Sequence, residues 1–171
     1  MRWTLHKMGT RNSMPIPVIA GIAWAVILGG VGGFMTTIGP WYRKLKKPSW
    51  QPPDWLFGPA WTIILGLAAW AAIIAWYAAH TEMERTAVVT LFLVNGVFHF
   101  AWSPLFFTLR RPDWALVEVI FLWGSLVSMV LVLWQISHQA SLLILPYLAW
   151  VSFAAFLNWT IVRLNQPFGK V

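Results

Sequence analysis

Three side chains that can form hydrogen bonds stand at helical spacing within an otherwise apolar stretch. Asn95, His99 and Trp102 follow one another at steps of four and three residues, so on a helix they share one face. In lipid an unpaired amide or imidazole is costly, so such groups turn toward the bundle interior, a neighbouring helix or a ligand cavity. For Asn95, a helix-to-helix hydrogen bond and a ligand contact both stay open. For His99, a structural hydrogen bond is favoured over ligation of a haem iron or proton transfer, because no second ligand has a recognisable spacing.

Two more helical stripes combine aromatic rings with small residues. Tyr147, Trp150, Ala154 and Asn158 repeat at steps of three or four residues, and Ala154 would leave room for a flat guest beside the rings. Trp61 begins a similar stripe, in which an aromatic ring is followed by aliphatic residues. We expect these stripes to line one pocket.

Glu118 is the one carboxylate placed well inside an apolar stretch, which makes it a functional candidate by default. Three structural roles compete with that interpretation: pairing with Arg110 or Arg111, extension toward the membrane surface, or protonation in a dry site. The sequence contains no Gly-rich phosphate loop, nucleophile–base arrangement or metal-binding cluster. We therefore expect no hydrolytic catalysis, no bound metal and no required cofactor.

The segment from Trp41 to Trp55 carries four aromatic residues, three prolines and four cations. Proline fixes φ and removes a backbone donor, so the segment is predicted to follow a semi-rigid, extended path. Such a path would hold the rings of Trp41, Tyr42 and Trp50 in set directions. The segment could therefore serve as a lid.

Composition places the chain in a bilayer. It is 59% hydrophobic and only 10% charged, unlike a water-soluble surface. The net charge of +7 comes from cations between apolar runs that form no basic helix face, which argues against nucleic acid and favours anionic lipid headgroups or an acidic ligand. Cysteine is absent, which excludes disulfides and thiolate chemistry.

Five apolar stretches are each long enough to cross the hydrocarbon region as a helix. The predicted spans are residues 16–38, 56–79, 86–109, 114–136 and 141–164. The last three loops are too short to fold separately, so consecutive helices must be antiparallel neighbours. We predict an all-α membrane protein with these parts: a basic tail over 1–15, a single five-helix domain over 16–165 with a long first loop over 39–56, and a C-terminal tail over 166–171.

The distribution of Lys and Arg predicts the orientation. Eight of them lie in the first loop, the third loop and the C-terminus, and four lie in the N-terminus and the other two loops. The positive-inside rule then places the C-terminus in the cytoplasm and the N-terminus outside. The expected location is a bacterial cell membrane.

Fourteen tryptophans are more than interfacial belts explain. Those that fall within the predicted spans include Trp61, Trp70, Trp102, Trp123, Trp150 and Trp159. Each indole offers a flat face and one N–H donor, which suits a planar aromatic ligand, although filling space between helices is the commoner role for any single tryptophan. Gly29, Gly30, Gly32 and Gly33 include a Gly-x-x-x-Gly spacing, which either permits close helix contact or provides space beside the loop.

These residues closely resemble the TspO/MBR family, which comprises the tryptophan-rich sensory proteins and the mitochondrial translocator (peripheral benzodiazepine receptor) proteins. The resemblance covers nearly everything after Met14. Its most specific parts are Trp41 and Tyr42, residues 47–62, Asn95, residues 102–107, and residues 145–154 followed by Leu157 and Asn158.

The resemblance implies a five-helix bundle, commonly a homodimer, whose pocket beneath the first loop binds tetrapyrroles such as protoporphyrin IX and haem, and isoquinoline or benzodiazepine ligands. It implies a sensor, transporter or buffer linked to haem metabolism and oxidative stress. Two alternatives stay open: light-dependent porphyrin degradation that uses Trp41, Trp61 and Trp150, and an interaction protein that binds lipids or proteins. The candidate ligand-binding residues are Trp41, Tyr42, Trp50, Trp61, Asn95, His99, Tyr147, Trp150 and Ala154.

Three positions depart from the family pattern. His99 stands where many members have Asn, and Glu118 stands where Asp is usual. The sterol-recognition motif of eukaryotic members needs a central Tyr, and Trp159 occupies the corresponding place here, so specific cholesterol binding is not expected.

Overall fold

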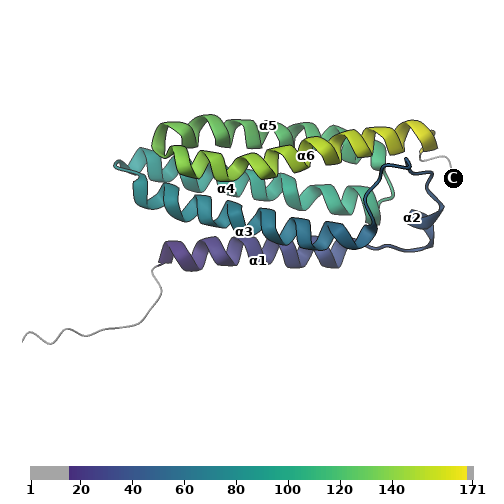
Figure 1. Ribbon diagram of the computed structural model, residues 1–171, viewed down its shortest axis with the longest axis horizontal. Coiled ribbons are helices and arrows are strands. Elements are labelled where there is room, and N and C mark those ends of the chain that lie inside the picture. Colours follow the sequence, from purple (N-terminus) through teal and green to yellow (C-terminus); the bar gives the residue numbers. More distant parts are fainter. Residues whose placement is uncertain (1–15, 169–171) are drawn as a thin grey trace, which may run out of the picture.

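Five long helices run side by side in the computed structural model, which describes residues 16–168 (Figure 1). They are α1 (Ile16–Met35), α3 (Asp54–Ala78), α4 (Glu82–Ser103), α5 (Pro112–Ile136) and α6 (His138–Asn165). Each is long and apolar enough to cross a membrane. The prediction of an all-α membrane protein with a five-helix bundle is therefore confirmed. The basic tail predicted over residues 1–15 lies outside the described residues.

The helices form a ring in the order α1, α3, α6, α5, α4, in which each contacts the next and α4 returns to α1. Helix α1 lies at the margin of the bundle beside α3 (Figure 1). It buries only Gly21 and Leu28. Its large apolar side chains, such as Val26 and Phe34, are exposed and suit contact with lipid tails.

The tightest core lies between α5 and α6, toward the turn that joins them. Leu126, Met129 and Leu133 on α5 and Ile144 and Val151 on α6 are fully buried. Because lipid tails are as apolar as these side chains, close van der Waals packing is what holds the two helices together here. This closely packed half therefore holds α5 and α6 together at one end of the bundle.

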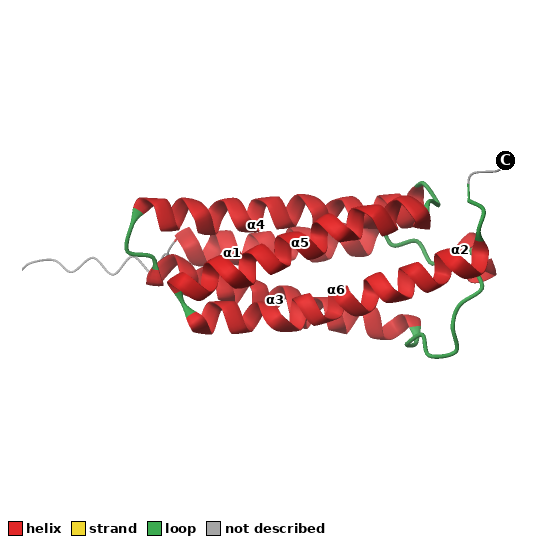
Figure 2. Ribbon diagram, turned by 90° about the horizontal axis from the view of Figure 1, so that it is seen from above, coloured by secondary structure: helices red, strands yellow, loops and turns green. Residues whose placement is uncertain are grey.

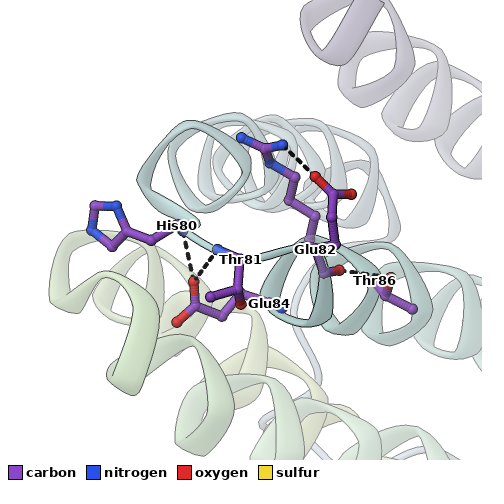
Figure 3. Close-up of polar contacts among 6 residues, drawn as sticks. His80, Thr81, Glu82, Glu84 and Thr86 are labelled. Atoms are coloured by element: carbon purple, nitrogen blue, oxygen red, sulfur yellow. Dashed lines mark hydrogen bonds and ion pairs between the residues drawn. The ribbon is translucent and has the colours of Figure 1, made fainter.

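Polar caps extend two helices beyond the predicted spans. Helix α4 begins at Glu82, one turn before the predicted start at Thr86, because Thr81 and Glu84 form a capping box. In this box Thr81 Oγ1 accepts a hydrogen bond from the Glu84 N–H, and the Glu84 carboxylate accepts one from the Thr81 N–H (Figure 3). Helix α6 likewise begins at His138, because Ser137 caps it. The apolar runs alone could not mark these polar first turns.

The C-terminal end of α4 continues into a π-helical turn, η1 (Pro104–Thr108). Pro104 has no N–H to donate, and the Leu109 N–H donates to the Pro104 carbonyl at 2.8 Å. Arg110 then takes a left-handed conformation, with φ of 54°, and the chain turns into α5. Phe106 is buried by this turn.

The long first loop contains a short helix, α2 (Pro40–Lys44), which lies at the end of the bundle near the last turns of α6 (Figures 1 and 2). The prediction of an extended path is wrong here, because Pro40 occupies the first helical turn, where its fixed φ fits and its missing N–H costs nothing. Residues 45–53 contain no helix or strand. The loop thus covers one end of the helices.

Gly96 permits a close contact between α1 and α4. Trp24 Nε1 donates to the Phe92 carbonyl at 3.0 Å, and a Cβ at position 96 would lie 3.0 Å from that nitrogen. We predict that Gly96→Ala displaces Trp24 and lowers the free energy of unfolding by about 1–3 kcal/mol, the usual cost of overpacking. Thermal unfolding in detergent micelles measures this.

The matched control is Gly66→Ala, because a Cβ at position 66 meets nothing within 4 Å. Alanine is the better helix former, so this variant should unfold at the same temperature as the wild type or higher. Equal unfolding temperatures for the two variants would show that Trp24 does not depend on the glycine.

Candidate ligand-binding site

A cavity of about 470 Å³ lies inside the bundle at the end covered by α2. Its volume falls in the range of small-molecule sites. All five long helices contribute to the walls, together with α2 and η1. The lining includes Leu28, Gly29, Gly32, Gly33, Thr36, Tyr42, Asp54, Phe57, Trp61, Thr62, Leu65, His99, Trp102, Ser103, Phe106, Val119, Leu122, Trp150, Ala154, Leu157 and Asn158.

Aromatic rings form the wall contributed by α3 and α6. The rings of Trp61 and Trp150 meet edge to face, with their centroids 6.3 Å apart. Phe57 meets Trp150 in the same way at 5.7 Å. Trp150 Nε1 is buried and has no hydrogen-bond partner among the described residues, as is also true of Trp102 Nε1. The wall therefore offers stacking surfaces and unused donors to a flat ligand.

His99 links α4 to α6 at the cavity. Its Nδ1 atom lies 2.7 Å from the hydroxyl of Tyr147, a residue that is fully buried. The Trp61 ring packs against the imidazole at 4.9 Å, nearly perpendicular to it. These contacts fix the ring plane of His99, which itself lines the cavity.

Tyr42 closes the cavity from the loop side. Its hydroxyl donates to Asp54 Oδ1 at 3.1 Å, and Gln51 Nε2 donates to both oxygens at 3.2 Å. Burial and then the Asp54 carboxylate raise the pKa of Tyr42 to about 12, so the hydroxyl stays protonated and keeps donating at neutral pH. Lys47 Nζ lies 3.5 Å from the centre of the Tyr42 ring, and burial lowers the pKa of that amine.

A second contact ties the loop to the end of α6. The Lys46 N–H donates to Asn165 Oδ1 and Asn165 Nδ2 donates to the Lys46 carbonyl, both at 2.8 Å. The side-chain amide of Asn165 thus satisfies both backbone groups of Lys46. The loop is therefore anchored at Asp54 of α3 and at Asn165 of α6.

Comparison with known proteins identifies the family. Residues 20–164 match the sequence pattern of the TspO/MBR family. The chain belongs to this family. The tryptophan-rich protein TspO of Chlorobaculum tepidum is 41% identical over 158 residues, which are 91% of this chain and 98% of that protein. The TspO of Archaeoglobus fulgidus is 38% identical over 152 residues, 88% of this chain and 97% of that protein. The translocator protein of Homo sapiens is 36% identical over 128 residues, 74% and 75% of the two chains.

The TspO/MBR bundle places the nine candidate residues in three groups. Five line the cavity: Tyr42, Trp61, His99, Trp150 and Ala154. Asn95 and Tyr147 are fully buried behind the wall. Trp41 packs edge-on against Phe106, and Trp50, which is 43% exposed, stacks on Phe156 outside the cavity.

The buried polar residues connect helices. Asn95 Nδ2 donates to Ser125 Oγ at 2.9 Å, which is the helix-to-helix hydrogen bond left open by the sequence. The Asn158 side-chain amide is oriented so that its nitrogen donates to the Pro112 carbonyl and its oxygen accepts from the Leu116 N–H, both at 3.1 Å. Each bond ties α5 to a neighbouring helix.

Glu118 does not pair with Arg111, one of the partners considered from the sequence. The Arg111 guanidinium binds the carboxylate of Asp113, two residues further along the chain. Glu118 is buried, and neither of its carboxylate oxygens has a hydrogen-bond partner within the described part of the chain. An extension of this side chain to the membrane surface is therefore wrong as well.

The tryptophans within the spans divide into inward and outward sets. Trp61, Trp102 and Trp150 line the cavity. Trp70, Trp123 and Trp159 are 62%, 43% and 40% exposed and are not part of the cavity lining. The spacing of the tryptophans along a helix could separate the two sets only if the face of the helix that points inward were already known.

The glycines of α1 provide space. Gly29, Gly32 and Gly33 line the cavity, and a Cβ at Gly33 would meet nothing within 4 Å. The close contacts between helices occur at Gly21, where a Cβ would lie 3.1 Å from Ile73, and at Gly96. The sequence did not point to either residue, because neither belongs to a Gly-x-x-x-Gly pair.

Sequence analysis also missed the roles of Asp54, Ser103 and Phe106 in the walls. Asp54 stood in the family motif and could have been found as the one carboxylate near the loop aromatics. Ser103 and Phe106 follow His99 by four and seven residues, which places them on the helical face that already carries Asn95, His99 and Trp102. Their spacing could therefore have found them.

We predict that Asn165→Ala loosens the loop without unfolding the bundle. Two exposed hydrogen bonds of about 0.5–1.5 kcal/mol each are lost, so exchange of the loop amides should accelerate about tenfold. Hydrogen–deuterium exchange of a peptide covering residues 42–50 measures the effect. The control is Gln166→Ala, a neighbouring exposed position. Unchanged exchange in Asn165→Ala would mean that α2 is held by its aromatic contacts alone.

Proposed function

We propose that this TspO/MBR protein binds tetrapyrroles such as protoporphyrin IX or haem in the cavity beneath the α2 loop. In this proposal it acts as a sensor, transporter or buffer in haem metabolism and oxidative stress. The observation that carries the proposal is a mainly apolar cavity of about 470 Å³, whose walls combine the indoles of Trp61 and Trp150 with the bare backbone of Gly29 and Gly32. Isoquinoline or benzodiazepine-type molecules share the flat apolar shape and are expected to compete for it.

The chemistry of a tetrapyrrole matches both ends of the site. Its flat ring can stack on indoles and lie against glycines, where no side chain interrupts the surface. Its carboxylate arms can reach toward the loop, where Arg43, Lys44 and Lys46 are exposed. The name of the human relative, translocator protein, is consistent with a carrier among the three roles.

We predict saturable binding of protoporphyrin IX by the purified protein in the dark. Quenching of tryptophan emission measures the affinity. Trp150→Ala removes a stacking surface and should weaken binding by about tenfold, because stacking on an aromatic ring contributes about 0.5–1.5 kcal/mol beyond buried area.

The matched control is Trp70→Ala, on the same helix as Trp61 but 62% exposed on the outer face. It should bind protoporphyrin as the wild type does. Equal weakening in both variants would indicate partition into the detergent micelle, and absence of binding in the wild type would refute the proposed function.

The adjacency of Trp61 and Trp150 at the cavity favours a second candidate function, light-dependent degradation of bound porphyrin by dioxygen. The porphyrin would absorb the light, and the protein would supply orientation and oxidisable indoles. Trp41, the third tryptophan considered from the sequence, packs on Phe106 and is not part of the cavity lining.

We predict that illumination of the aerobic complex yields a new absorbing product, and that Trp61→Phe slows its formation more than Trp41→Phe does. Absorption spectra recorded during illumination follow the product. A spectrum that changes no more than that of free porphyrin would remove this candidate and leave binding unaffected.

We also propose that two copies associate through the outer face of α1 in a bacterial cell membrane, with the loop and C-terminus in the cytoplasm. Helix α1 buries only two residues within one copy, and Gly30 has open space around it. A bare glycine surface permits the close approach of a second helix in lipid. The alternative role as a lipid- or protein-interaction module would use the same face.

A further inference from the structure

Asp54 gives the covered end of the cavity a negative charge. Among the described residues that line the cavity it is the one carboxylate, and none of them is a Lys or an Arg. Its Oδ1 atom accepts from the Tyr42 hydroxyl at 3.1 Å and from Gln51 Nε2 at 3.2 Å, and both donors are neutral. Within residues 16–168 no ion pair cancels the charge of Asp54. A ligand carboxylate that approaches this end therefore meets repulsion unless a cation stands close.

The first loop supplies four cations, and one of them differs from the rest. Arg43, Lys44 and Lys46 are exposed, so water and salt screen their charges. Lys47 is only partly exposed, and its Nζ atom lies 3.5 Å from the centre of the Tyr42 ring. Tyr42 is itself buried and lines the cavity. Lys47 therefore holds its charged group against a wall of the site.

The amine of Lys47 lacks an anionic partner. Among residues 16–168, its Nζ atom forms no ion pair, and the face of the Tyr42 ring is the contact that it makes. Burial is the largest influence on the pKa of Lys47 and lowers it, the nearby Arg43 lowers it further, and the Asp54 carboxylate opposes both. An amine that has lost part of its water without gaining an anion favours a ligand that brings one.

The side chain of Lys47 starts from a fixed point and has the freedom to reach such a group. The backbone of the preceding residue, Lys46, is bonded twice to the side chain of Asn165 on α6. A lysine ammonium is a compact charge on a flexible stem of four carbons, so it can leave the Tyr42 ring without movement of the loop backbone. The charge can therefore move from the ring to a carboxylate at the edge of the cavity.

We propose that Lys47 binds a carboxylate arm of a flat acidic ligand, such as protoporphyrin, at the edge of the cavity beside Tyr42. The inference rests on the proposed function and specifies which loop cation the ligand requires. The Lys47 amine donates charge-assisted hydrogen bonds to the arm and offsets the repulsion from Asp54. The three exposed cations of the loop contribute only through their screened charges. Lys47 thus selects an acid over a neutral ligand of the same shape.

The test compares protoporphyrin IX, a diacid, with its dimethyl ester, which has the same ring and no charge. Lys47→Gln removes the charge and keeps most of the side-chain length. It should weaken binding of the diacid about five- to tenfold, the loss expected for a charged hydrogen bond at a partly exposed position. Binding of the ester should change less than about twofold, because the ester has no charge to pair. Quenching of tryptophan emission in the dark measures both affinities on the full chain, and their ratio cancels any difference in partition into the detergent.

Two further variants isolate the position and the charge. Lys44→Gln is the matched control, because it removes an exposed cation from the end of α2, and it should change the affinity for the diacid less than about twofold. Lys47→Arg keeps the charge at the same position and should keep the preference for the diacid. Thermal unfolding of each variant verifies that it is folded.

The outcomes separate this inference from the proposed function. Equal weakening of diacid and ester in Lys47→Gln would mean that the side chain acts by packing on Tyr42, and equal weakening of the diacid in Lys44→Gln would mean a diffuse attraction by the loop. Either result overturns the inference and leaves the proposed function standing, as does unchanged diacid binding in Lys47→Gln or a lost preference in Lys47→Arg. Wild-type protein that binds neither porphyrin refutes both.

Discussion

The structure depends on one constraint: inside a bilayer, a polar side chain without a partner is costly. Asn95 binds Ser125 across α4 and α5, His99 binds Tyr147 across α4 and α6, and the Asn158 amide binds the first turn of α5. These contacts join three helices around one end of the bundle. They hold the walls at set separations, so a space between the walls persists where apolar side chains alone would have packed inward.

The two ends of the bundle consequently differ. Toward the turn between α5 and α6, aliphatic side chains such as Leu133 and Ile144 fill the interior completely. Toward α2, the facing surfaces are the glycines of α1 and the rings of α3 and α6. Glycine contributes no volume, and rigid rings that meet edge to face cannot collapse into the gap. The space that side chains would fill at the glycines of α1 is therefore left open for a ligand.

The sequence was sufficient for the fold because apolar length decides which segments span a membrane. It also found Trp61, His99 and Trp150, whose helical spacing shares a face with other polar or small residues. It could not place Trp50, which stacks on Phe156 outside the cavity, because the direction of a loop ring depends on tertiary contacts. It missed Phe106, which stands seven residues after His99 on the same face, because an apolar ring on a membrane helix suits the lipid side as well as the interior.

The locations of the anchors determine which part of the protein can move. The bonds of Asn95 and Tyr147 lie in the apolar interior, where breaking one leaves an unpaired polar group without water. The bonds between Lys46 and Asn165 lie at an exposed end, where water replaces each lost partner at little cost. The α2 loop is therefore the part of the wall that can move at the lowest cost. Because Tyr42 lines the cavity and belongs to that loop, movement of the loop changes the covered end of the cavity.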